Sequence, residues 1–587
     1  MIDLINVEKP ARYTGGEFNE IVKDHDKMQS SYAFCFPDIY EVGMSHLGMR
    51  ILYHVINRRK TTVCERVFAP WTDMEQLMRA NKVPLFSLET KKPLKEFDIV
   101  GFTLQYEMSY TNVLNMLDLA DIPIRRSIRT DEHPIIMAGG PCAANPVTLE
   151  DVIDIFLIGE GEEVMNEVLD LYEDGKSAGQ SKEDFLKESV KIEGVYVPKY
   201  HDFDKKVIKR IIKNLDSVSF PTDSIVPYMN IVHDRASLEL FRGCIRGCRF
   251  CQAGYIYRPV REKKASTLIE QTKRILADTG YNEIGMVSLS TSDYTDLKTL
   301  CDGMLEHTEK RMVNLSVPSM RIDNFSIELM NRIQKVRKSG LTFAPEAGSQ
   351  RLRDVINKNI TEEEILTSAK IAKSGGYDNI KLYFMLGLPT ETDEDVIAIA
   401  ELAGKILDIF GRKSRINITV STSFFVPKPF TPFQWCPQIT VEEMIRRQRL
   451  LRSHIKEKKI KYNWHDFNTS VVESAISRGD RQVGQAIIKA WEKGCKFDSW
   501  NELFDMEKWE QAFSECSLDI YECASKQIAL DEELPWDFID IGVKKSFLKN
   551  EYQKALREET TENCREHCNN CGIAKYRCGV CFEDNKI

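Results

Sequence analysis

Residues 238–251 read LELFRGCIRGCRFC, and this stretch decides the fold. Its first four letters predict a short, partly buried strand. Cys244, Cys248 and Cys251 follow directly, in the spacing C-x3-C-x2-C. Gly243 and Gly247 allow the loop to turn closely around whatever the three thiols bind. A strand that ends in a cysteine loop is therefore expected to open an α/β unit.

Three thiolates at this spacing predict a [4Fe–4S] cluster, because they can occupy three corners of the cubane and leave the fourth iron open. An amino acid that chelates the open iron through its amine and carboxylate would place a sulfonium within electron-transfer reach. Zinc is the alternative, but structural zinc takes four protein ligands. Neither a second C-x-x-C nor a histidine pair stands close by in the sequence.

Six strands alternate with helical stretches across residues 232–436, which predicts a partial (β/α)6 barrel rather than a complete eight-fold one. The predicted strands are Leu238–Phe241, Ile284–Leu289, Val313–Val317, Leu341–Phe343, Ile380–Leu386 and Ile416–Ser423.

An earlier series of strands and helices predicts a doubly wound, flavodoxin-like α/β domain over residues 31–175. Its predicted strands are Tyr32–Phe36, Asp98–Leu104, Pro134–Met137 and Ile155–Ile158. Residues 1–30 are a polar lead-in, and residues 176–231 are a connector. After about residue 437 the strand pattern ends, which predicts a helical region over residues 437–560.

The last part, residues 561–587, is a cysteine-rich tail that is too short to fold around a core without a metal. Two readings stay open for it: an auxiliary [4Fe–4S] cluster, or a structural zinc site built on two C-x-x-C pairs, with His567 as a further possible ligand. The tail cysteines are Cys564, Cys568, Cys571, Cys578 and Cys581.

Composition agrees with a protein of the cytoplasm. The 587 residues include 16 cysteines, and clustered cysteines in a reducing compartment indicate metal ligands rather than disulfides. No apolar run approaches the ~20 residues that cross a bilayer, so no membrane association is expected. A net charge of −9 argues against extensive coating of nucleic acid.

The barrel motifs together resemble the radical SAM superfamily. Besides the cysteines, the resemblance rests on an aromatic residue before the third cysteine, a polar segment after the second strand, a Glu-x-x-Ser segment after the fourth and a Gly-Leu-Pro segment after the fifth. It implies that these residues contact S-adenosylmethionine (SAM): Phe250, Ser288, Ser290, Ser292, Glu346, Ser349, Arg351, Lys381, Gly387 and Pro389.

This resemblance implies an enzyme that reductively cleaves SAM into methionine and a 5′-deoxyadenosyl radical, which then abstracts hydrogen from a substrate. The one-electron donor would be a protein such as flavodoxin or ferredoxin. The expected outcome is modification of a C–H bond, by methyl or methylthio transfer or by rearrangement, on an unknown substrate.

The N-terminal domain resembles the cobalamin-binding-like domain that is fused to many radical SAM enzymes. The resemblance rests on Gly139-Gly140-Pro141 and Gly159-Glu160-Gly161-Glu162. The cobalt-ligating pattern Asp-x-His-x-x-Gly is incomplete around His46, so a histidine at a helix is the alternative. Bound cobalamin is left open.

Two other functions remain. One is a methylthiotransferase acting on a tRNA or a ribosomal protein, although the usual N-terminal three-cysteine domain is absent from this sequence. The other is a non-catalytic Fe–S/SAM-binding sensor or RNA-binding module. Arg446–Lys461 holds eight basic residues and one acid, which fits either an RNA contact or a solvated helix face.

Overall fold

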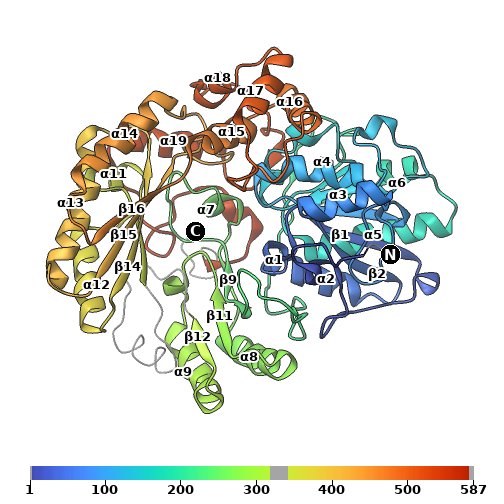
Figure 1. The fold of residues 1–587 in the computed structure, drawn as a ribbon, viewed down its shortest axis with the longest axis horizontal. Coiled ribbons are helices and arrows are strands. Elements are labelled where there is room, and N and C mark those ends of the chain that lie inside the picture. The colour runs from blue at the N-terminus through green and yellow to red at the C-terminus, as the bar shows by residue number, and fades with distance from the viewer. Residues whose placement is uncertain (1–2, 317–340, 581–587) are drawn as a thin grey trace.

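The computed structural model describes residues 3–316 and 341–580 (Figure 1). The chain is a mixed α/β protein with parallel sheets, as the sequence predicts. The N-terminal unit lies at the right of Figure 1, and the strands of the second unit lie at the lower centre and left. Helices of the C-terminal third run along the top of the view and connect the two units. None of the described helices is both long and apolar enough to span a membrane.

The first unit is one six-stranded sheet in the order β2-β1-β3-β4-β5-β6, parallel except for β6. Its elements are β1 (Ser30–Phe36), α1 (Tyr40–Gly43), α2 (Leu47–Asn57), β2 (Thr62–Phe68), α3 (Thr72–Asn81), β3 (Ile99–Thr103), α4 (Tyr110–Leu119), β4 (Ile135–Gly139), β5 (Ile155–Leu157), α5 (Gly161–Ser177), α6 (Lys182–Ser189) and β6 (Val195–Tyr196). All seven residues of β1 are buried, as expected for a parallel strand with helices on both faces.

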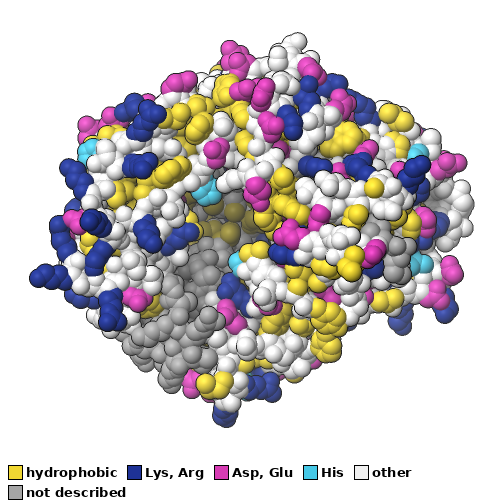
Figure 2. Space-filling model, viewed as in Figure 1, with side chains coloured by type: hydrophobic (Ala, Val, Ile, Leu, Met, Phe, Trp, Pro, Cys, Tyr) yellow, Lys and Arg dark blue, Asp and Glu magenta, His cyan; other side chains and the backbone are white. Residues whose placement is uncertain are grey.

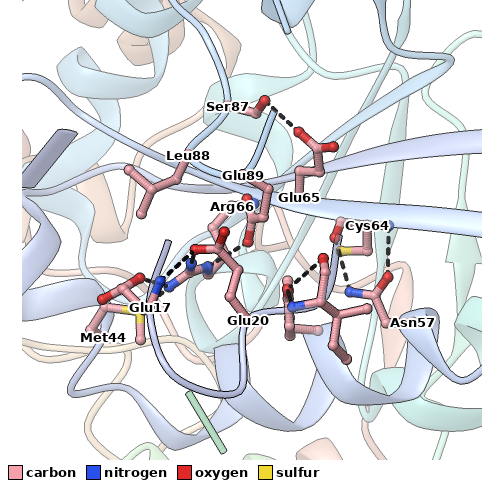
Figure 3. A network of polar contacts seen from close by, with 12 residues as sticks. Glu17, Glu20, Met44, Asn57, Cys64, Glu65, Arg66, Ser87, Leu88 and Glu89 are labelled. Carbon is pink, nitrogen blue, oxygen red and sulfur yellow. Dashed lines mark hydrogen bonds and ion pairs between the residues drawn. The ribbon is translucent and has the colours of Figure 1, made fainter. Parts of the chain in front are cut away.

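Strand β2 was not predicted, because charged residues interrupt its apolar pattern. Figure 3 shows the reason: Arg66, in the middle of β2, lies in a buried network of carboxylates. Its side chain is 1% exposed and pairs with Glu17 at 2.7 Å, Glu20 at 3.0 Å and Glu89 at 2.7 Å. Three acids around one guanidinium compensate the cost of burying that charge. The lead-in that carries Glu17 and Glu20 is thereby fixed to the sheet.

The second unit holds two parallel sheets, β12-β11-β8 and β13-β14-β15-β16, and the short antiparallel pair β9 and β10. Its elements are β8 (Ala236–Glu239), β9 (Phe241–Arg242), α7 (Ala253–Ile256), β10 (Arg261–Glu262), α8 (Ala265–Thr279), β11 (Glu283–Val287), α9 (Leu297–Thr308), β12 (Asn314–Ser316), β13 (Leu341–Glu346), α11 (Gln350–Val355), α12 (Glu362–Ser374), β14 (Asn379–Leu386), α13 (Asp393–Phe410), β15 (Asn417–Phe424), α14 (Val441–His454) and β16 (Ile460–Trp464).

Strand β16 corrects the prediction that the strands end before residue 437. It pairs in parallel with β15, from Ile418 opposite Ile460 to Thr422 opposite Trp464. The apolar pattern of the sequence does not reveal β16, because this edge strand, of sequence IKYNW, has only one buried residue. The basic run is therefore no single helix: α14 ends at His454, and the run continues into this strand.

The C-terminal third is otherwise helical, as predicted. It holds α15 (Phe467–Ser477), α16 (Arg481–Glu492), α17 (Met506–Glu515), α18 (Ile520–Ser525), β17 (Ile539–Asp540) and α19 (Lys545–Leu556). Helix α16 packs on α4, and β17 pairs with β7 (Val207–Ile208) of the connector. The tail beyond α19, described up to residue 580, packs against the segment around β9 and β10, where the N–H of Cys564 donates to the carbonyl of Ile245 and that of Val580 to the carbonyl of Val260.

Candidate functional site

The cysteine loop connects β9 to α7. A turn closes it, in which the N–H of Cys251 donates to the carbonyl of Cys248 at 3.2 Å. Gly243 has φ +87°, and a Cβ there would lie 2.8 Å from the carbonyl oxygen of Pro259. Only glycine fits this approach without strain. The three thiols are half-buried on one loop.

Electrostatics within the loop favour a bound cation. Burial, with a smaller contribution from the neighbouring Cys248, raises the pKa of Cys244 to about 12 and that of Cys251 to about 11. Thiols that raise one another's pKa become thiolates together when a metal compensates their charge. Across residues 3–316 and 341–580, no three His, Cys, Asp or Glu side chains meet in metal-coordinating geometry. The loop therefore fits a cluster because it offers three thiols and because these thiols lie close to one another.

Four parts of the fold hold this loop. Arg249, between the second and third cysteines, is fully buried and donates to the carbonyl of Val355 at 2.8 Å and to that of Glu559 at 2.7 Å. Asn357 Nδ2 donates to the carbonyl of Gly247 at 3.1 Å. Gln252 Nε2 reaches the carbonyl of Pro429 at 3.3 Å.

The segment after β11 is tied to the same loop. Asp293 Oδ2 accepts from Nε of Arg246 at 3.0 Å and from Oγ of Ser290 at 2.7 Å. Ser288 Oγ lies 2.9 Å from the hydroxyl of Thr291. Ser288 and Ser290 thus lie in the segment that is tied to the cysteine loop, and Ser292 lies between Ser290 and Asp293 in the chain. Asp293 itself was not chosen as a site residue, although its place after two serines was visible in the sequence.

The end of β13 faces the third cysteine. Glu346 has φ +68°, an unusual conformation for a residue with a side chain. Its Oε1 pairs with Nζ of Lys358 at 3.2 Å. Both charges act on the pKa of Cys251, the lysine lowering it and the glutamate raising it, so both lie near that thiol. Phe250 is partly buried in the apolar cluster beside them.

Ser349 and Arg351 are engaged with a residue that the sequence did not single out. Both contact Asp395, at the start of α13, and Arg351 Nη1 also pairs with Glu558 at 3.1 Å. Ser349 additionally caps α11 by accepting from the N–H of Leu352 at 3.1 Å. The two predicted SAM contacts therefore form a polar junction around a buried carboxylate.

The fifth-strand residues divide into two places. Gly387 has φ +82° and donates its N–H to Glu391 at 2.8 Å, so Gly387 and Pro389 form the turn that follows β14. Lys381 lies six residues earlier on the same strand, a distance of about 20 Å along an extended chain. Its Nζ stacks over the ring of Tyr383 at 4.5 Å. The structure therefore separates Lys381 from Gly387 and Pro389 along β14.

A cavity of about 410 Å³ opens between the first sheet and the start of the second unit. Strand ends of the first sheet supply Gly139 and Gly140, and the segment after β9 supplies Gly243 and Tyr257. Ser288, near the cysteine loop, also lines it. The cavity therefore reaches from the carboxyl edge of the doubly wound sheet, where such folds bind ligands, to the cysteine loop.

His46 lines this cavity as the N-cap of α2. Its Nδ1 accepts from the N–H of Met49 at 3.2 Å, so the ring proton sits on Nε2. Burial lowers the pKa of His46 to about 4, against a smaller opposite effect of the Gln105 side chain. The imidazole is neutral and its Nδ1 caps the helix, which matches the alternative of a helix histidine.

Gly140 and Gly159, two glycines of the motifs behind the cobalamin-domain resemblance, allow close contacts within the chain itself. A Cβ on Gly159, where φ is +112°, would lie 2.2 Å from the carbonyl oxygen of Arg210. One on Gly140 would lie 2.6 Å from that of Leu104. Both glycines let two segments of this chain approach each other.

Ion pairs close the cavity rim. Glu160 accepts from Nη1 and Nη2 of Arg261 at 2.6 and 2.7 Å, and Glu162 pairs with Arg242. Arg242 also pairs with Glu239 of β8 at 2.8 Å. Two arginines beside the cysteine loop are thus joined to acids of the first sheet, so that the two units are held together across the cavity.

The tail cysteines Cys564, Cys568, Cys571 and Cys578 lie in the described part of the chain, and Cys581 lies outside it.

Lys and Arg side chains gather on the left flank of Figure 2, where Figure 1 places α12 to α14. Arg446 and Arg447 of the basic run are paired there with Asp393 and Glu391.

Two family models match the chain: "Radical SAM proteins, N-terminal" over residues 48–198 and "Radical SAM superfamily" over residues 238–403. The chain is 29% identical to the uncharacterized protein MJ0966 of Methanocaldococcus jannaschii over 78% of its own length and 91% of that protein. It is 23% identical to the uncharacterized methyltransferase PH0819 of Pyrococcus horikoshii, over 54% of this chain and 66% of that one. The solved structure of the radical SAM methyltransferase TsrM from Kitasatospora setae, with cobalamin and a [4Fe–4S] cluster bound, aligns with 12% identity and a TM-score of 0.47, over 69% and 76% of the two chains.

The second match begins at the first strand of the two-sheet unit and includes the cysteine loop, the segment after β11 and the turn after β14. This chain is therefore an enzyme of the radical SAM superfamily.

Proposed function

We propose that Cys244, Cys248 and Cys251 hold a [4Fe–4S] cluster and that the enzyme reductively cleaves SAM there, releasing methionine and a 5′-deoxyadenosyl radical. The proposal rests on one observation. Asp293 bonds both Arg246 of the cysteine loop and Ser290 of the segment after β11, beside three thiols that interact electrostatically. When bound, the cluster supplies the electron that breaks the carbon–sulfur bond of SAM. A low-potential donor such as flavodoxin or ferredoxin is the proposed source of that electron.

The side chains of the protein position the cluster ligands and SAM. Arg249 and Asn357 fix the loop backbone, so that the thiols keep one arrangement. Lys358 brings a positive charge close to Cys251, which favours the thiolate form. Glu346, held by Lys358 in a strained conformation, is the proposed partner of the SAM amino group.

We place the substrate in the cavity of about 410 Å³, whose size suits a drug-sized organic molecule. Phe241, Ile256 and Leu289 give it apolar walls next to the cysteine loop. A radical formed there would be surrounded by side chains, because the ion pairs of Glu160 and Glu162 close the rim. The proposed reaction is modification of a substrate C–H bond, by methyl or methylthio transfer or by rearrangement.

The residues do not fit a histidine-ligated cobalamin. Nδ1 of His46 accepts from the N–H of Met49, which puts the ring proton on Nε2, the nitrogen that a cobalt ion would need. Absorbance after incubation with hydroxocobalamin and desalting tests this, since the proposal expects any retained corrin band to be the same in His46→Asn as in the wild type, and a band that His46→Asn shifts would contradict it.

Methylthio transfer to a tRNA or a ribosomal protein is the second candidate. One observation favours it: a second set of cysteines lies directly against the first loop, where the N–H of Cys564 donates to the carbonyl of Ile245 at 3.0 Å. A sulfur source beside the radical site is what such a transfer requires.

Electron paramagnetic resonance of the dithionite-reduced protein, with and without SAM, tests the proposed function. Binding of SAM to an open iron changes the g-values of the reduced cluster. The proposal expects this change in the wild type and in Lys381→Ala, and its absence in Cys251→Ala. A reduced spectrum that SAM leaves unaltered in the wild type would overturn the open-iron site.

A further inference from the structure

A second cavity, of about 510 Å³, lies between the tail, Arg258 and the segment from Asp540 to Lys544. Three cysteines line it, Cys564, Cys568 and Cys571, together with His567 and the backbone around Gly572. They repeat the C-x3-C-x2-C spacing of the first loop. A cavity of this volume exceeds the ~30 Å³ share of one water molecule many times, so it has room for a group much larger than a single ion.

The tail is built onto the first cysteine loop and its flanks. Besides the bond from Cys564 to Ile245, the N–H of Val580 donates to the carbonyl of Val260 at 2.9 Å. Arg565 Nη2 reaches Glu262 at 2.6 Å and the carbonyl of Asp293 at 3.0 Å. These bonds order a segment that has little core of its own.

Arg258 joins the two cysteine sets through its buried side chain. Its Nε donates to the carbonyl of Gly254 at 2.9 Å, and its Nη2 donates to that of Arg246 at 3.0 Å. Arg258 also lines the tail cavity beside Cys564 and Cys571. A buried guanidinium needs a compensating negative charge, which thiolates bound to a metal centre provide.

We propose that Cys564, Cys568 and Cys571 hold a second iron–sulfur cluster in this cavity, against the loop of the first. Single-ion zinc fits less well, because structural zinc draws four donors to one point, whereas the cavity that the three thiols line has a volume of about 510 Å³. The 3.0 Å bond from Cys564 to Ile245 places the Cα atoms of Cys244 and Cys564 within roughly 10 Å of each other. The two clusters would therefore exchange electrons and interact magnetically.

Metal counting on the anaerobically reconstituted full-length protein tests this proposal separately from the proposed function. Iron, acid-labile sulfide and zinc are measured in the wild type, in Cys568→Ser/Cys571→Ser and in Cys248→Ser/Cys251→Ser. About eight iron atoms per chain are expected in the wild type and about four in each double variant, one cubane being left in each. Reduced wild type should also show a spin-coupled resonance that both variants lack.

Cys516→Ser is the matched control, since Cys516 is a half-buried cysteine at the end of α17, outside both sets. Far-ultraviolet circular dichroism checks that every variant is folded, and the tail variant must keep the SAM-dependent spectrum of the first cluster. About one zinc and four iron atoms in the wild type would overturn the proposal. So would a folded tail variant that keeps all its iron. Loss of iron only in the Cys248→Ser/Cys251→Ser variant would leave the tail without a cluster and equally refute it.

Discussion

Nη2 of Arg249 lies 3.2 Å from Oε2 of Glu551, so that a buried ion pair joins the first cysteine loop to α19, 302 residues later in the chain. Both side chains are almost fully buried, at 0% and 2% exposure. The loop that is proposed to hold the cluster therefore depends on the C-terminal third of the protein.

Replacing Arg249 by Met should destabilise the protein by about 3 kcal/mol, because Glu551 loses its buried partner and keeps the half-buried Lys554 at 3.2 Å, while the cysteine loop loses the hydrogen bonds of the guanidinium. Urea denaturation measures the change, and the variant should also retain less iron after reconstitution. Arg452→Met is the control, since that exposed arginine only stacks on Trp464. The double change Arg249→Met/Glu551→Leu should recover part of the loss, and no recovery would argue against the charge as its cause.

Asp293→Asn should leave the iron content unchanged and slow the cleavage of SAM. The carboxylate positions Arg246 of the loop and Ser290 of the adjacent segment. Loss of such a supporting partner commonly costs 10–100-fold in activity. The measurement is the rate of 5′-deoxyadenosine formation per cluster. Wild-type rates with full iron would show that this junction has no part in the reaction.

The stability of the protein should rise with pH between about 4 and 6.5 through His46. Burial lowers its folded pKa to about 4 from the ordinary 6.5, and nearby Arg50 acts in the same direction. Between these values the unfolded chain binds the extra proton, so stability is complete above 6.5 and falls as the pH drops toward 4. The shift corresponds to at most about 3 kcal/mol.

Denaturation at pH 4.5 and 7 should therefore show a smaller pH effect in His46→Asn than in the wild type. Asparagine keeps the N-cap acceptor of α2 and does not titrate. Equal pH dependence in the two proteins would mean that other groups cause it.

Gly159→Ala should destabilise the protein in the absence of any ligand, by more than the ~1 kcal/mol of a positive φ alone. The new Cβ would lie 2.2 Å from the carbonyl oxygen of Arg210. Gly179→Ala is the matched control, because Gly179 has φ +72° and open space around it. Thermal melting compares them. Equal melting temperatures for the two variants would contradict the close backbone contact at Gly159 and would favour a ligand contact there instead.

Much of the fold was predictable because buried parallel strands such as β1 and β3 appear as apolar runs between helices. Strands β2 and β16 were missed for opposite reasons. Strand β2 contains the charged Arg66, which is buried only because carboxylates from distant parts of the sequence pair with it. Strand β16 is an exposed edge strand and therefore has no apolar pattern. Neither reason can be read from local pattern, since both depend on neighbours brought in by the tertiary fold.

The candidate site divides in the same way. Spacing identified Cys244, Cys248 and Cys251, since the chemistry of three thiols depends on local sequence. Arg249 and Asp395 escaped prediction, because their importance comes from contacts with Glu551 and with Arg351.

Anaerobic incubation of the reconstituted protein with SAM and dithionite tests the central claim most directly. Methionine and 5′-deoxyadenosine are measured in the wild type and in Cys251→Ala, with Cys516→Ser as the control. The account predicts equal amounts of both products in the wild type and the control, and none in Cys251→Ala. An iron-loaded wild type without 5′-deoxyadenosine, or an equally active Cys251→Ala, would contradict it.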